Sequence, residues 1–481
     1  MQHTEARHDL AVRGGVLIDG SGAPRRRADV LVTDGRISGV VAPGAGRARD
    51  TLDAVGRVVC PGFIDSHSHD DQFVLSPGLP QPKLSQGVCT VVTGNCGISL
   101  APLVSDAPPA PLDLMGERAF RYPHFADYLA ALDAATLDVN VVPLIGHITL
   151  RVHYVKNLQL TATPSETQAM KAEVQDAMVA GAFGLSTGVY YPPARAATTQ
   201  ELKGVADGLR GHIAVLACHL RDEGDHIDEA LREALAVARH SGATLVLSHH
   251  KVVGPQNHGR TRNTLRAVDE AAQQQPVCLD CYPYDASSTM LDPDKAARTR
   301  EVLLTWSVPH PEYSGRSLHS IAHEWGLDVT QTARRLMPGG AIYFSMAEED
   351  VQRVLSHPLC MIGSDGLPHD SRPHPRLWGS FARVLGHYSR DLGLMPLELA
   401  VHKMTGLPAS RFGLTDRGLV REGMAADLVV FDPDVVRDTA TYADPRAPAL
   451  GIDTVLVNGQ LAVSHGLVLP ARAGKRLKRS V

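Results

Sequence analysis

The stretch PGFIDSHSHDD, from Pro61 to Asp71, ends an apolar run with two closely spaced histidines. Residues two apart lie on the same face of a β-strand. If Val58 to Ser66 forms a strand, His67 and His69 leave its end side by side, where both imidazoles can bind one metal ion. Two exposed loop histidines would give the same pattern, so the interpretation depends on the rest of the chain.

Helical patterns alternate with short apolar strands through the middle of the chain. TPSE, from Thr163 to Glu166, predicts a capped helix start with proline at the first helical position. The apolar runs that follow predict strands, namely AFGLSTG, HIAVLACHL, ATLVLSHHK and VCLDCYPY. Repeated β–α units imply parallel strands. We therefore expect an α/β fold with a closed (β/α)8 barrel of the TIM type.

The two ends of the chain resemble each other. Both contain short β-rich runs, and Asp-Gly at 19–20 and 34–35 and Asn-Gly at 458–459 are hairpin signals. We expect residues 1–60 and 414–481 to form a small β-sandwich domain beside a catalytic barrel at 61–413. A segment at about 285–344 interrupts the rhythm, with no clear strand before AIYFS, and is expected to lie over the barrel like a lid.

Bulk composition excludes several classes of protein. The chain has 481 residues, a formal net charge of −5 and a pI near 6.5, which does not fit a nucleic-acid-binding protein. No signal-peptide core and no apolar run of about 18 residues is present, so we expect no membrane partner and a cytoplasmic location. Seven cysteines, one of them without a partner in any pairing, argue against a disulfide scaffold. Oligomeric state is not predicted.

Metal-capable side chains occur repeatedly where a predicted strand ends. They are His67, His69, Cys96, His219, His249 and Asp365. In a barrel of this kind, chemistry gathers at the carboxyl ends of the strands. Imidazole, thiolate and carboxylate together suit Zn²⁺ rather than Mg²⁺ or Ca²⁺. Asp365 is the candidate general base, because a carboxylate beside a cation stays ionised and can accept a proton from water.

These residues resemble the amidohydrolase superfamily. GFIDSHSH is similar to its first-strand metal motif, and RGLVREGMAADLVVFDP and VLVNGQ are similar to its C-terminal signature. Within the superfamily, the chain resembles the N-acyl-D-amino-acid deacylases. The stretches that carry this likeness are GNCG, GLSTGVYYPP, CHLRDEGD, LSHHK, CYPYDASSTM, GSDGLPHD and HPRLWGSF.

The resemblance implies a role for each candidate residue. Cys96, His219 and His249 would hold one tight zinc ion, and His67 and His69 would form a second, weaker site that shares Cys96. The implied reaction hydrolyses an N-acyl-D-amino acid, the small-molecule substrate, to a carboxylate and a D-amino acid, with Asp365 as the base. The candidate substrate contacts are Lys251, Tyr282, Ser287, Ser288, Arg376 and Tyr191. His250 would face away, and Arg221 and Glu223 would support the ligands.

The substrate side chain is predicted from the segment after Tyr282. Met290 and Leu291 favour neutral, apolar side chains, whereas Lys295, Arg298 and Arg300 could bind a second carboxylate, as in relatives specific for D-glutamate. Since Asp292 and Asp294 partly neutralise these cations, we expect a broad preference for apolar substrates. An N-acyl-D-glutamate deacylase is the alternative. A cyclic amidase, which usually carries a bridging lysine, and a scaffold without metal are less consistent with the residues present.

Overall fold

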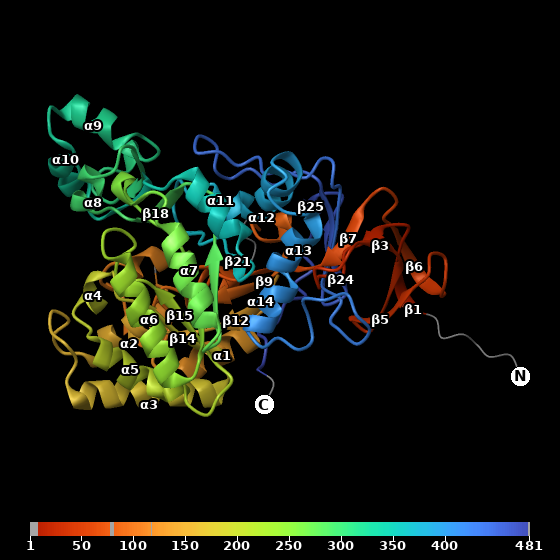
Figure 1. The fold of residues 1–481 in the computed structure, drawn as a ribbon, viewed down its shortest axis with the longest axis horizontal. Helices are drawn as coiled ribbons and strands as arrows, with labels where there is room; N and C mark the ends of the chain where they lie inside the picture. Colours follow the sequence, from red (N-terminus) through yellow and green to blue (C-terminus); the bar gives the residue numbers. More distant parts are fainter. Residues whose placement is uncertain (1–7, 77–80, 117, 480–481) are drawn as a thin grey trace, which may run out of the picture.

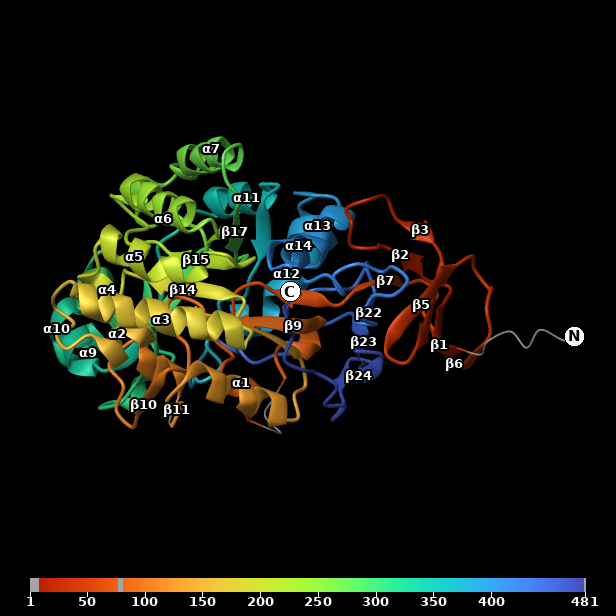
Figure 2. The same ribbon diagram turned by 90° about the horizontal axis from the view of Figure 1, so that it is seen from below.

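The computed structural model describes residues 8–76, 81–116 and 118–479 (Figures 1 and 2). Its parallel strands form a three-stranded sheet of order β12–β9–β8 and a six-stranded sheet of order β13–β14–β15–β16–β17–β21. The strands of the three-stranded sheet are β8 (Phe63–Asp65), β9 (Val88–Thr93) and β12 (Asn140–Pro143). Those of the other sheet are β13 (Ile145–Gly146), β14 (Gly184–Gly188), β15 (Val215–His219), β16 (Thr244–Leu247), β17 (Val277–Cys281) and β21 (Cys360–Ile362).

Backbone contacts connect the two parallel sheets at both of their ends. Only Leu144 separates β12 from β13, and its N–H donates to the Thr93 carbonyl at 3.0 Å. At the other end, the N–H of Asp365 donates to the His67 carbonyl at 2.8 Å, and Ser68 forms a parallel bridge with Gly366. The segments that follow β8 and β21 therefore lie side by side.

Buried side chains on one face of these strands form a single cluster. The cluster contains side chains from β8, β9, β12, β15, β16, β17 and β21. It also contains Phe183, the residue before β14. The opposite faces of the same strands contribute to the largest core cluster, where they pack with helical residues such as Val174 and Val268. Burial of both faces explains why the strand sequences are apolar almost throughout.

Helices follow most of the parallel strands, as the sequence periodicity predicts. They include α1 (Phe125–Ala134), α2 (His147–Tyr154), α3 (Pro164–Ala180), α5 (Thr199–Ala206), α6 (Ile227–Ser241), α7 (Thr261–Ala272), α11 (Glu348–Ser356) and α13 (Leu397–Met404). The predicted start of α3 is confirmed, because the Thr163 side chain accepts from the Glu166 N–H and the Glu166 carboxylate accepts from the Thr163 N–H. Among the described residues, no helix is both long and apolar enough to cross a membrane.

The apolar run before His67 forms two strands rather than the single strand expected from Val58 to Ser66. Strand β7 (Val58–Pro61) pairs with the C-terminal strand β22 (Leu428–Phe431), whereas β8 pairs with β9. Gly62 separates the two, and a Cβ atom there would collide with the side chain of Cys89. The close approach at Gly62 lets the chain pass directly from one sheet into the next.

The two ends of the chain build a shared sheet, as expected. Its order is β25–β24–β23–β22–β7–β2–β3, so the four C-terminal strands continue into the three N-terminal strands through the pairing of β22 with β7. The N-terminal strands are β2 (Val16–Leu17) and β3 (Arg26–Arg27), and the C-terminal strands are β23 (Ile452–Val457), β24 (Gln460–Ser464) and β25 (Leu467–Val468). A second sheet, β5–β4–β1–β6, consists of β1 (His8–Arg13), β4 (Asp29–Thr33), β5 (Arg36–Val41) and β6 (Ala48–Asp53). One core cluster contains side chains of both sheets, including Val30 and Val430.

Two of the three hairpin signals mark tight turns. Asp34-Gly35 joins β4 to β5 and Asn458-Gly459 joins β23 to β24, and all four residues have positive φ. The signal at Asp19-Gly20 is not a tight hairpin, because eight residues separate β2 from its partner β3. Asp19 instead accepts hydrogen bonds from the N–H and hydroxyl of Ser21.

The segment from Ala286 to Phe344 contains more strand than the sequence predicts. Strands β18 (Ala286–Met290), β19 (Val302–Ser307) and β20 (Gly339–Phe344) form an antiparallel sheet of order β18–β20–β19, so the expectation of no strand before AIYFS is wrong. Helices α8 (Pro293–Ala297), α9 (Leu318–Trp325) and α10 (Val329–Leu336) pack with this sheet around Leu304 and Tyr343. Figure 1 shows the segment as a separate lobe at one end of the parallel strands.

Candidate metal centre and active site

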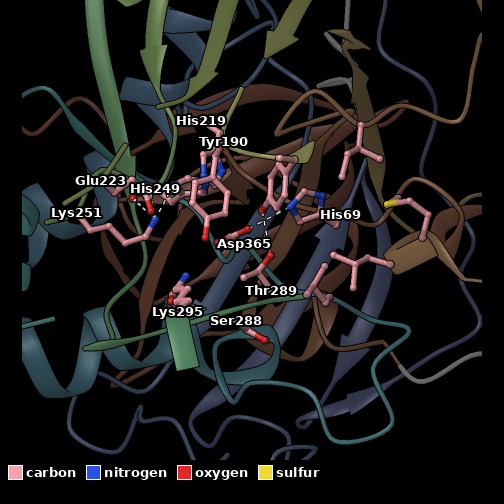
Figure 3. Close-up of a pocket in the computed structure, with 16 residues that line it drawn as sticks. His69, Tyr190, His219, Glu223, His249, Lys251, Ser288, Thr289, Lys295 and Asp365 are labelled. Atoms are coloured by element: carbon pink, nitrogen blue, oxygen red, sulfur yellow. Dashed lines mark hydrogen bonds and ion pairs between the residues drawn. The ribbon is translucent and has the colours of Figure 1, made fainter. Parts of the chain in front are cut away.

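The predicted metal-capable residues all lie at the carboxyl ends of parallel strands. His67 and His69 follow β8, Cys96 follows β9, His219 ends β15, His249 follows β16 and Asp365 follows β21. Figure 3 shows His69, His219, His249 and Asp365 around one cavity. Parallel strands bring residues far apart in the sequence to this one edge, which is why these side chains meet.

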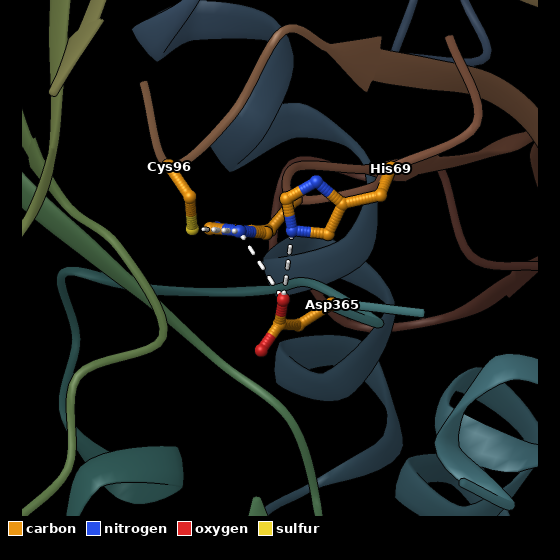
Figure 4. Close-up of side chains that lie close together, drawn as sticks. His69, Cys96 and Asp365 are labelled. Carbon is orange, nitrogen blue, oxygen red and sulfur yellow. Dashed lines mark hydrogen bonds and ion pairs between the residues drawn. The ribbon is translucent and has the colours of Figure 1, made fainter. Parts of the chain in front are cut away.

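The ligand atoms form two overlapping groups. His67, His69, Cys96 and Asp365 make one group and Cys96, His219 and His249 make the other, and within each group the atoms lie within 4.8 Å of one another. The Cys96 Sγ atom lies 3.3 Å from Nε2 of His67 and 3.3 Å from Nε2 of His249. Figure 4 shows Cys96, His69 and Asp365 of the first group close together. Cys96 is therefore placed to serve both groups.

The donor set fits zinc. Nε2 of His249 lies 2.9 Å from Nδ1 of His219, and Nε2 of His69 lies 3.2 Å from Oδ1 of Asp365. Two imidazole nitrogens that face each other beside a cysteine sulfur, all buried, are the ligand types of a zinc site. Acceptor atoms that converge in this way are stable together when a cation lies between them.

Three of these residues have backbone conformations that side chains rarely adopt. The φ angle is +53° at Cys96, +38° at His249 and +49° at Asp365. Left-handed conformations are uncommon outside glycine and cost of order 1–3 kcal/mol each unless the surroundings impose them. Their occurrence at three converging strand ends shows that the local backbone is constrained in order to aim these side chains inward.

Charges around Cys96 favour its thiolate. Burial alone would raise the pKa of the Cys96 thiol, but nearby His67 and His249 outweigh burial and hold that pKa well below its usual value. Thiolate is the form that binds metal. The backbone around Cys96 is also tightly enclosed, since a Cβ atom at Gly188 would collide with the Cys96 carbonyl.

The carboxylate of Asp280 contacts two of the histidines. Its Oδ1 atom lies 3.2 Å from Nδ1 of His67 and accepts a 2.7 Å hydrogen bond from the His249 N–H. A carboxylate on the far nitrogen of a metal-binding imidazole fixes the ring and its tautomer. Sequence reasoning missed Asp280, although a charged residue inside the apolar strand VCLDC is an informative signal.

Glu223 and Lys251 support His249 from the other side. The Nζ atom of Lys251 donates to Oε1 of Glu223 at 2.7 Å, and the same carboxylate oxygen lies 3.1 Å from Nδ1 of His249. Glu223 therefore contacts the imidazole of His249, one of the clustered metal-capable residues. Arg221 does not contact the site, because its guanidinium pairs with Glu233 at 2.8 Å.

A buried ion-pair network connects the ends of β8 and β21. Oδ1 of Asp65 accepts from the N–H groups of His67 at 3.2 Å and Ser364 at 2.8 Å. Lys83 donates to Oδ2 of Asp65 at 2.7 Å and to the Ser364 hydroxyl at 2.6 Å, and Asp70 lies 3.3 Å from the same ammonium. Sequence reasoning missed Lys83, because PQPKLSQ carries no pattern that separates a buried lysine from an exposed one.

Asp365 lies between the histidines and an arginine. Its Oδ1 atom is 3.5 Å from Nε2 of His67 and 3.2 Å from Nε2 of His69, while Oδ2 pairs with Nη1 of Arg376 at 2.7 Å. Burial alone would raise the pKa of Asp365, but Arg376 and the histidines outweigh it and hold that pKa well below the usual range. Asp365 is therefore ionised.

The cavity beside the ligands has a volume of about 30 Å³, and four of the predicted substrate contacts line it. They are Lys251, Ser287, Ser288 and Tyr191. The hydroxyls of Ser287 and Ser288 are buried without a partner among the described residues. Tyr191 donates to or accepts from Thr289 at 3.1 Å.

The other two predicted contacts, Tyr282 and Arg376, do not line this cavity. Tyr282 lines a neighbouring cavity, and its hydroxyl is buried without a partner among the described residues. The guanidinium of Arg376 lies over the Tyr282 ring at 4.5 Å and pairs with Asp365, so its charge is already partly engaged. Arg376 therefore contacts the candidate base Asp365 directly.

A larger cavity of about 470 Å³ opens beside the first and shares Tyr190, Glu223 and Lys295 with it. Lys295, from α8 of the lobe segment, lines both cavities, and Figure 3 shows its ammonium group directed into the first one. Tyr190, which the sequence does not separate from Tyr191, stacks on His219 with ring centres 5.4 Å apart. Both Tyr190 and Tyr191 therefore border the site.

Two sequence features lie outside the site. His250 faces away from the metal-capable cluster, as expected, and its Nε2 atom lies 2.8 Å from the Thr264 hydroxyl. Burial lowers the pKa of His250 to about 4, which keeps it neutral. Cys278 and Cys281 point to different neighbours, the carbonyls of Leu245 and Tyr282, and do not form a joint site.

Known proteins resemble this chain over nearly its full length. Residues 50–214 and 195–463 match the amidohydrolase family. The chain is 51% identical over 473 residues to a D-aminoacylase of Alcaligenes xylosoxydans xylosoxydans, with 98% of each chain covered. It is also 50% identical over 461 residues to an N-acyl-D-aspartate deacylase of the same organism, covering 95% of this chain and 92% of that protein.

A solved structure is equally similar. The N-acyl-D-glutamate deacylase of Bordetella bronchiseptica, solved with zinc and a phosphonate inhibitor that mimics the tetrahedral intermediate, superposes on this chain with a TM-score of 0.94. It is 48% identical, and the match covers 98% of this chain and all of that chain. The fold is therefore the TIM-barrel-like fold of amidohydrolases.

Proposed function

Because the chain belongs to the amidohydrolase family, we propose that it hydrolyses the amide bond of N-acyl-D-amino acids, giving a carboxylate and a free D-amino acid. The observation that carries the proposal is the convergence of Cys96, His219 and His249 with His67, His69 and Asp365 beside a cavity. Relatives at about half identity are named for this reaction on different D-amino acids. A metal-free scaffold would not keep a complete ligand set.

Zinc is the proposed metal. Cys96, His219 and His249 would hold the tightly bound ion, and His67 and His69 would hold a second, weaker one that shares Cys96. Zinc bound here would polarise the amide carbonyl and make water nucleophilic at neutral pH. The Cys96 sulfur lies 3.3 Å from an imidazole nitrogen of each group, which supports Cys96 as the bridging ligand. Cyclic amidases typically use a lysine in this role.

Asp365 moves the proton. Its ionised carboxylate can accept a proton from the attacking water at Oδ1, the oxygen that faces His67 and His69. The proton then passes to the amide nitrogen as the C–N bond breaks, so that the D-amino acid leaves as a neutral amine. Arg376 on Oδ2 keeps the carboxylate oriented and ionised between turnovers.

The amino-acid part of the substrate would bind at the polar end of the cavity. The hydroxyls of Ser287 and Ser288, which have no partner among the described residues, suit a buried α-carboxylate together with the ammonium of Lys251. The Tyr282 hydroxyl lies in the neighbouring cavity. Arg376 adds a guanidinium behind Tyr282. The Tyr191 hydroxyl, which also lines the cavity, would polarise the scissile carbonyl.

A narrower candidate is an enzyme for acidic D-amino acids, and Lys295 favours it. Met290 and Leu291, which favour apolar substrates in the sequence, do not line the cavity, and Leu291 packs inside the lobe. Lys295 does line it, and among the described residues no carboxylate forms an ion pair with this ammonium. Asp292 does not neutralise it directly, because its carboxylate accepts from backbone N–H groups at the start of α8.

The barrel and the domain division are part of the same proposal. We infer that the parallel strands close into a (β/α)8 barrel, with β12 and β13 counted as one strand. The contacts between the segments after β8 and β21 support this inference, as does the core cluster formed by one face of the strands. Residues 61–413 would form this barrel, with 285–344 above its mouth and 1–60 and 414–481 forming a β-sandwich. A cytoplasmic location is supported by seven free cysteines.

The deciding experiment is a panel of N-acetyl-D- and N-acetyl-L-amino acids with purified, zinc-loaded protein. Hydrolysis of D-substrates at least 100-fold faster than their L-enantiomers is expected. Dihydroorotate and hydantoins, included in the same panel, test the cyclic-amidase alternative. Faster turnover of a cyclic amide than of any linear D-substrate would overturn the proposal.

A further inference from the structure

We propose that Arg221 is a positioning residue, which holds the hydroxyl group of Tyr191 in place although Arg221 itself does not line the cavity. The inference rests on the proposed function, which it deepens, because that function assigns to Tyr191 the polarisation of the scissile carbonyl. Arg221 acts on residues 190–197, here called the tyrosine turn. This turn follows β14 and begins with Tyr190 and Tyr191.

The tyrosine turn packs two aromatic rings against one metal-capable residue. The ring of Tyr190 stacks on that of His219, with ring centres 5.4 Å apart and planes inclined at 25° (Figure 3). The ring of Tyr191 lies 5.0 Å from the same imidazole, at 58°. A shift of the turn therefore moves the Tyr191 hydroxyl relative to the ligands.

The tyrosine turn has little regular structure of its own to hold it in place. Its helix, α4 (Pro192–Arg195), has only four residues, and the ends of a helix leave backbone groups that need partners from outside. Pro192 and Pro193 also lack the N–H groups that would donate hydrogen bonds within the turn. Side chains of other elements supply donors to its carbonyl groups instead.

Arg221 donates hydrogen bonds to two of these carbonyl groups. Its Nη1 atom donates to the Arg195 carbonyl at 3.0 Å, and its Nη2 atom donates to the Ala197 carbonyl at 2.8 Å. Its Nε and Nη2 atoms also pair with the two carboxylate oxygens of Glu233 in α6, at 2.8 and 3.0 Å. One planar guanidinium thus connects the turn to α6, in a geometry that a lysine ammonium cannot reproduce.

A chain of contacts leads from Arg221 back to the metal-capable cluster. Arg195, whose carbonyl accepts from Arg221, donates from its own guanidinium to the Tyr190 carbonyl at 3.3 Å. Tyr190 stacks on His219, and His219 lies two residues before Arg221 in the sequence. The tyrosine turn is therefore fixed relative to the same strand end that presents His219.

A second arginine explains why loss of Arg221 should loosen the turn without unfolding the protein. The Nε atom of Arg151 donates to the Pro193 carbonyl at 2.8 Å, and Arg151 is fully buried. The side chain of Arg221, by contrast, is 31% exposed. We therefore expect an Arg221 variant to keep its fold, with the turn still held at Pro193 but released at Arg195 and beyond.

The first test compares Arg221→Met with the wild type, both loaded with zinc. We expect kcat for an N-acetyl-D-amino acid to fall about tenfold or more, with KM within about threefold of wild type and zinc content unchanged, because Tyr191 acts in the transition state. An effect on KM alone, or loss of zinc, would overturn the inference. Arg232→Met is the control, since Arg232 lies on the same helix as Glu233 but pairs with Glu229 at the surface, and it should leave kcat unchanged.

A double-mutant cycle tests whether Arg221 acts through Tyr191. Tyr191→Phe removes the hydroxyl and keeps the ring, so adding Arg221→Met to it should lower kcat by less than about threefold. Equal losses in the two backgrounds would overturn the inference. Arg221→Lys, which also serves if Arg221→Met does not fold, keeps the charge beside Glu233 without the planar fork. Its kcat should stay about fivefold or more below that of wild type, and a full kcat would contradict the positioning role.

Hydrogen exchange separates failure of this inference from failure of the proposed function. Amide exchange of residues 190–197 is measured by mass spectrometry in the wild type, Arg221→Met and Arg232→Met. Exchange in the turn should become about tenfold faster or more in Arg221→Met and stay at the wild-type rate in Arg232→Met. Unchanged exchange in Arg221→Met overturns the inference whether or not any N-acyl-D-amino acid is hydrolysed. Faster exchange in a protein that hydrolyses none of them would locate the error in the proposed function instead.

Discussion

The ammonium of Lys83 lies 2.7 Å from Oδ2 of Asp65, and the two side chains are 2% and 0% exposed. Asp65 in turn accepts from the N–H groups of His67, a member of the second ligand group, and of Ser364, the neighbour of the candidate base Asp365. One buried ion pair thus determines how the strand that carries His67 lies against the strand that carries Asp365.

Removal of the Lys83 charge should destabilise the protein strongly. Lys83→Met leaves the carboxylates of Asp65 and Asp70 buried without their cation, and breaking a buried pair in this way typically costs about 3–5 kcal/mol. The measurement is the free energy of unfolding from urea denaturation. Lys171→Met is the control, because Lys171 pairs with Asp207 at 3.9 Å near the surface and should contribute no more than about 1 kcal/mol. Equal effects of the two variants would contradict the prediction.

Loss of the Cys96 sulfur should remove tightly bound zinc and activity together. Cys96 is the residue that both ligand groups share, so Cys96→Ala weakens both. Zinc content after gel filtration and kcat with N-acetyl-D-amino acids are measured on the same preparation. Cys218→Ala is the control, since Cys218 is also buried and lies next to His219 but is not among the clustered metal-capable residues. A Cys96→Ala protein with full zinc and normal turnover would show that the site is wrongly assigned.

Asp365→Asn should lower kcat while zinc stays bound. Asparagine keeps the shape of the side chain but cannot accept a proton, and general acid–base catalysis typically supplies roughly 10²–10⁴-fold. Asp370→Asn changes a buried carboxyl of the same loop that is not among the clustered metal-capable residues, and it should leave kcat within about threefold of wild type. If Asp365→Asn also stays within about threefold, Asp365 is not the base.

The strand ends were predictable from the sequence for a physical reason. Apolar runs such as TLVLSH and LCMIGSD show where a buried strand stops, and polar residues at those points must meet at one edge if the strands are parallel. Asp280 and Lys83 could not be found in this way. Both act behind the ligands, and their partners come from strands or turns far away in the sequence.

Two segments show where sequence patterns fail. The run from Val58 to Ser66 is apolar on both sides of Gly62, so nothing in it reveals that the chain changes sheets there. Strand β18 reads ASSTM, and its small polar residues face the cavity rather than a core, so the usual alternation of apolar side chains is absent.

Substitution of Lys295 should change the preferred D-amino acid. Lys295→Met keeps the aliphatic part of the side chain but removes the charge that faces the cavity. We expect kcat/KM for N-acetyl-D-glutamate to fall at least tenfold relative to that for N-acetyl-D-leucine. Arg298→Met, at the outer cavity, is the control and should change this ratio less than threefold. If Lys295→Met leaves the ratio unchanged, or if wild type already prefers N-acetyl-D-leucine by 100-fold, the narrower specificity is wrong.

The same preference should depend on pH. Burial lowers the pKa of Lys295 to about 8; the nearby cations Lys251 and Arg376 act in the same direction, and Glu223 and Asp292 partly oppose it. The rings of Tyr190 and Tyr343 lie beside its ammonium. Lys295 is therefore charged below pH 8 and loses its charge as the pH rises through 8. The ratio of kcat/KM for N-acetyl-D-glutamate to that for N-acetyl-D-leucine should be constant up to about pH 7 and fall toward pH 9. Because both substrates use the same metal site and the same base, titration of those groups cancels in the ratio. Lys295→Met should abolish the pH dependence of the ratio, and a wild-type ratio that stays flat from pH 6 to pH 9 would show that Lys295 does not contact the substrate side chain.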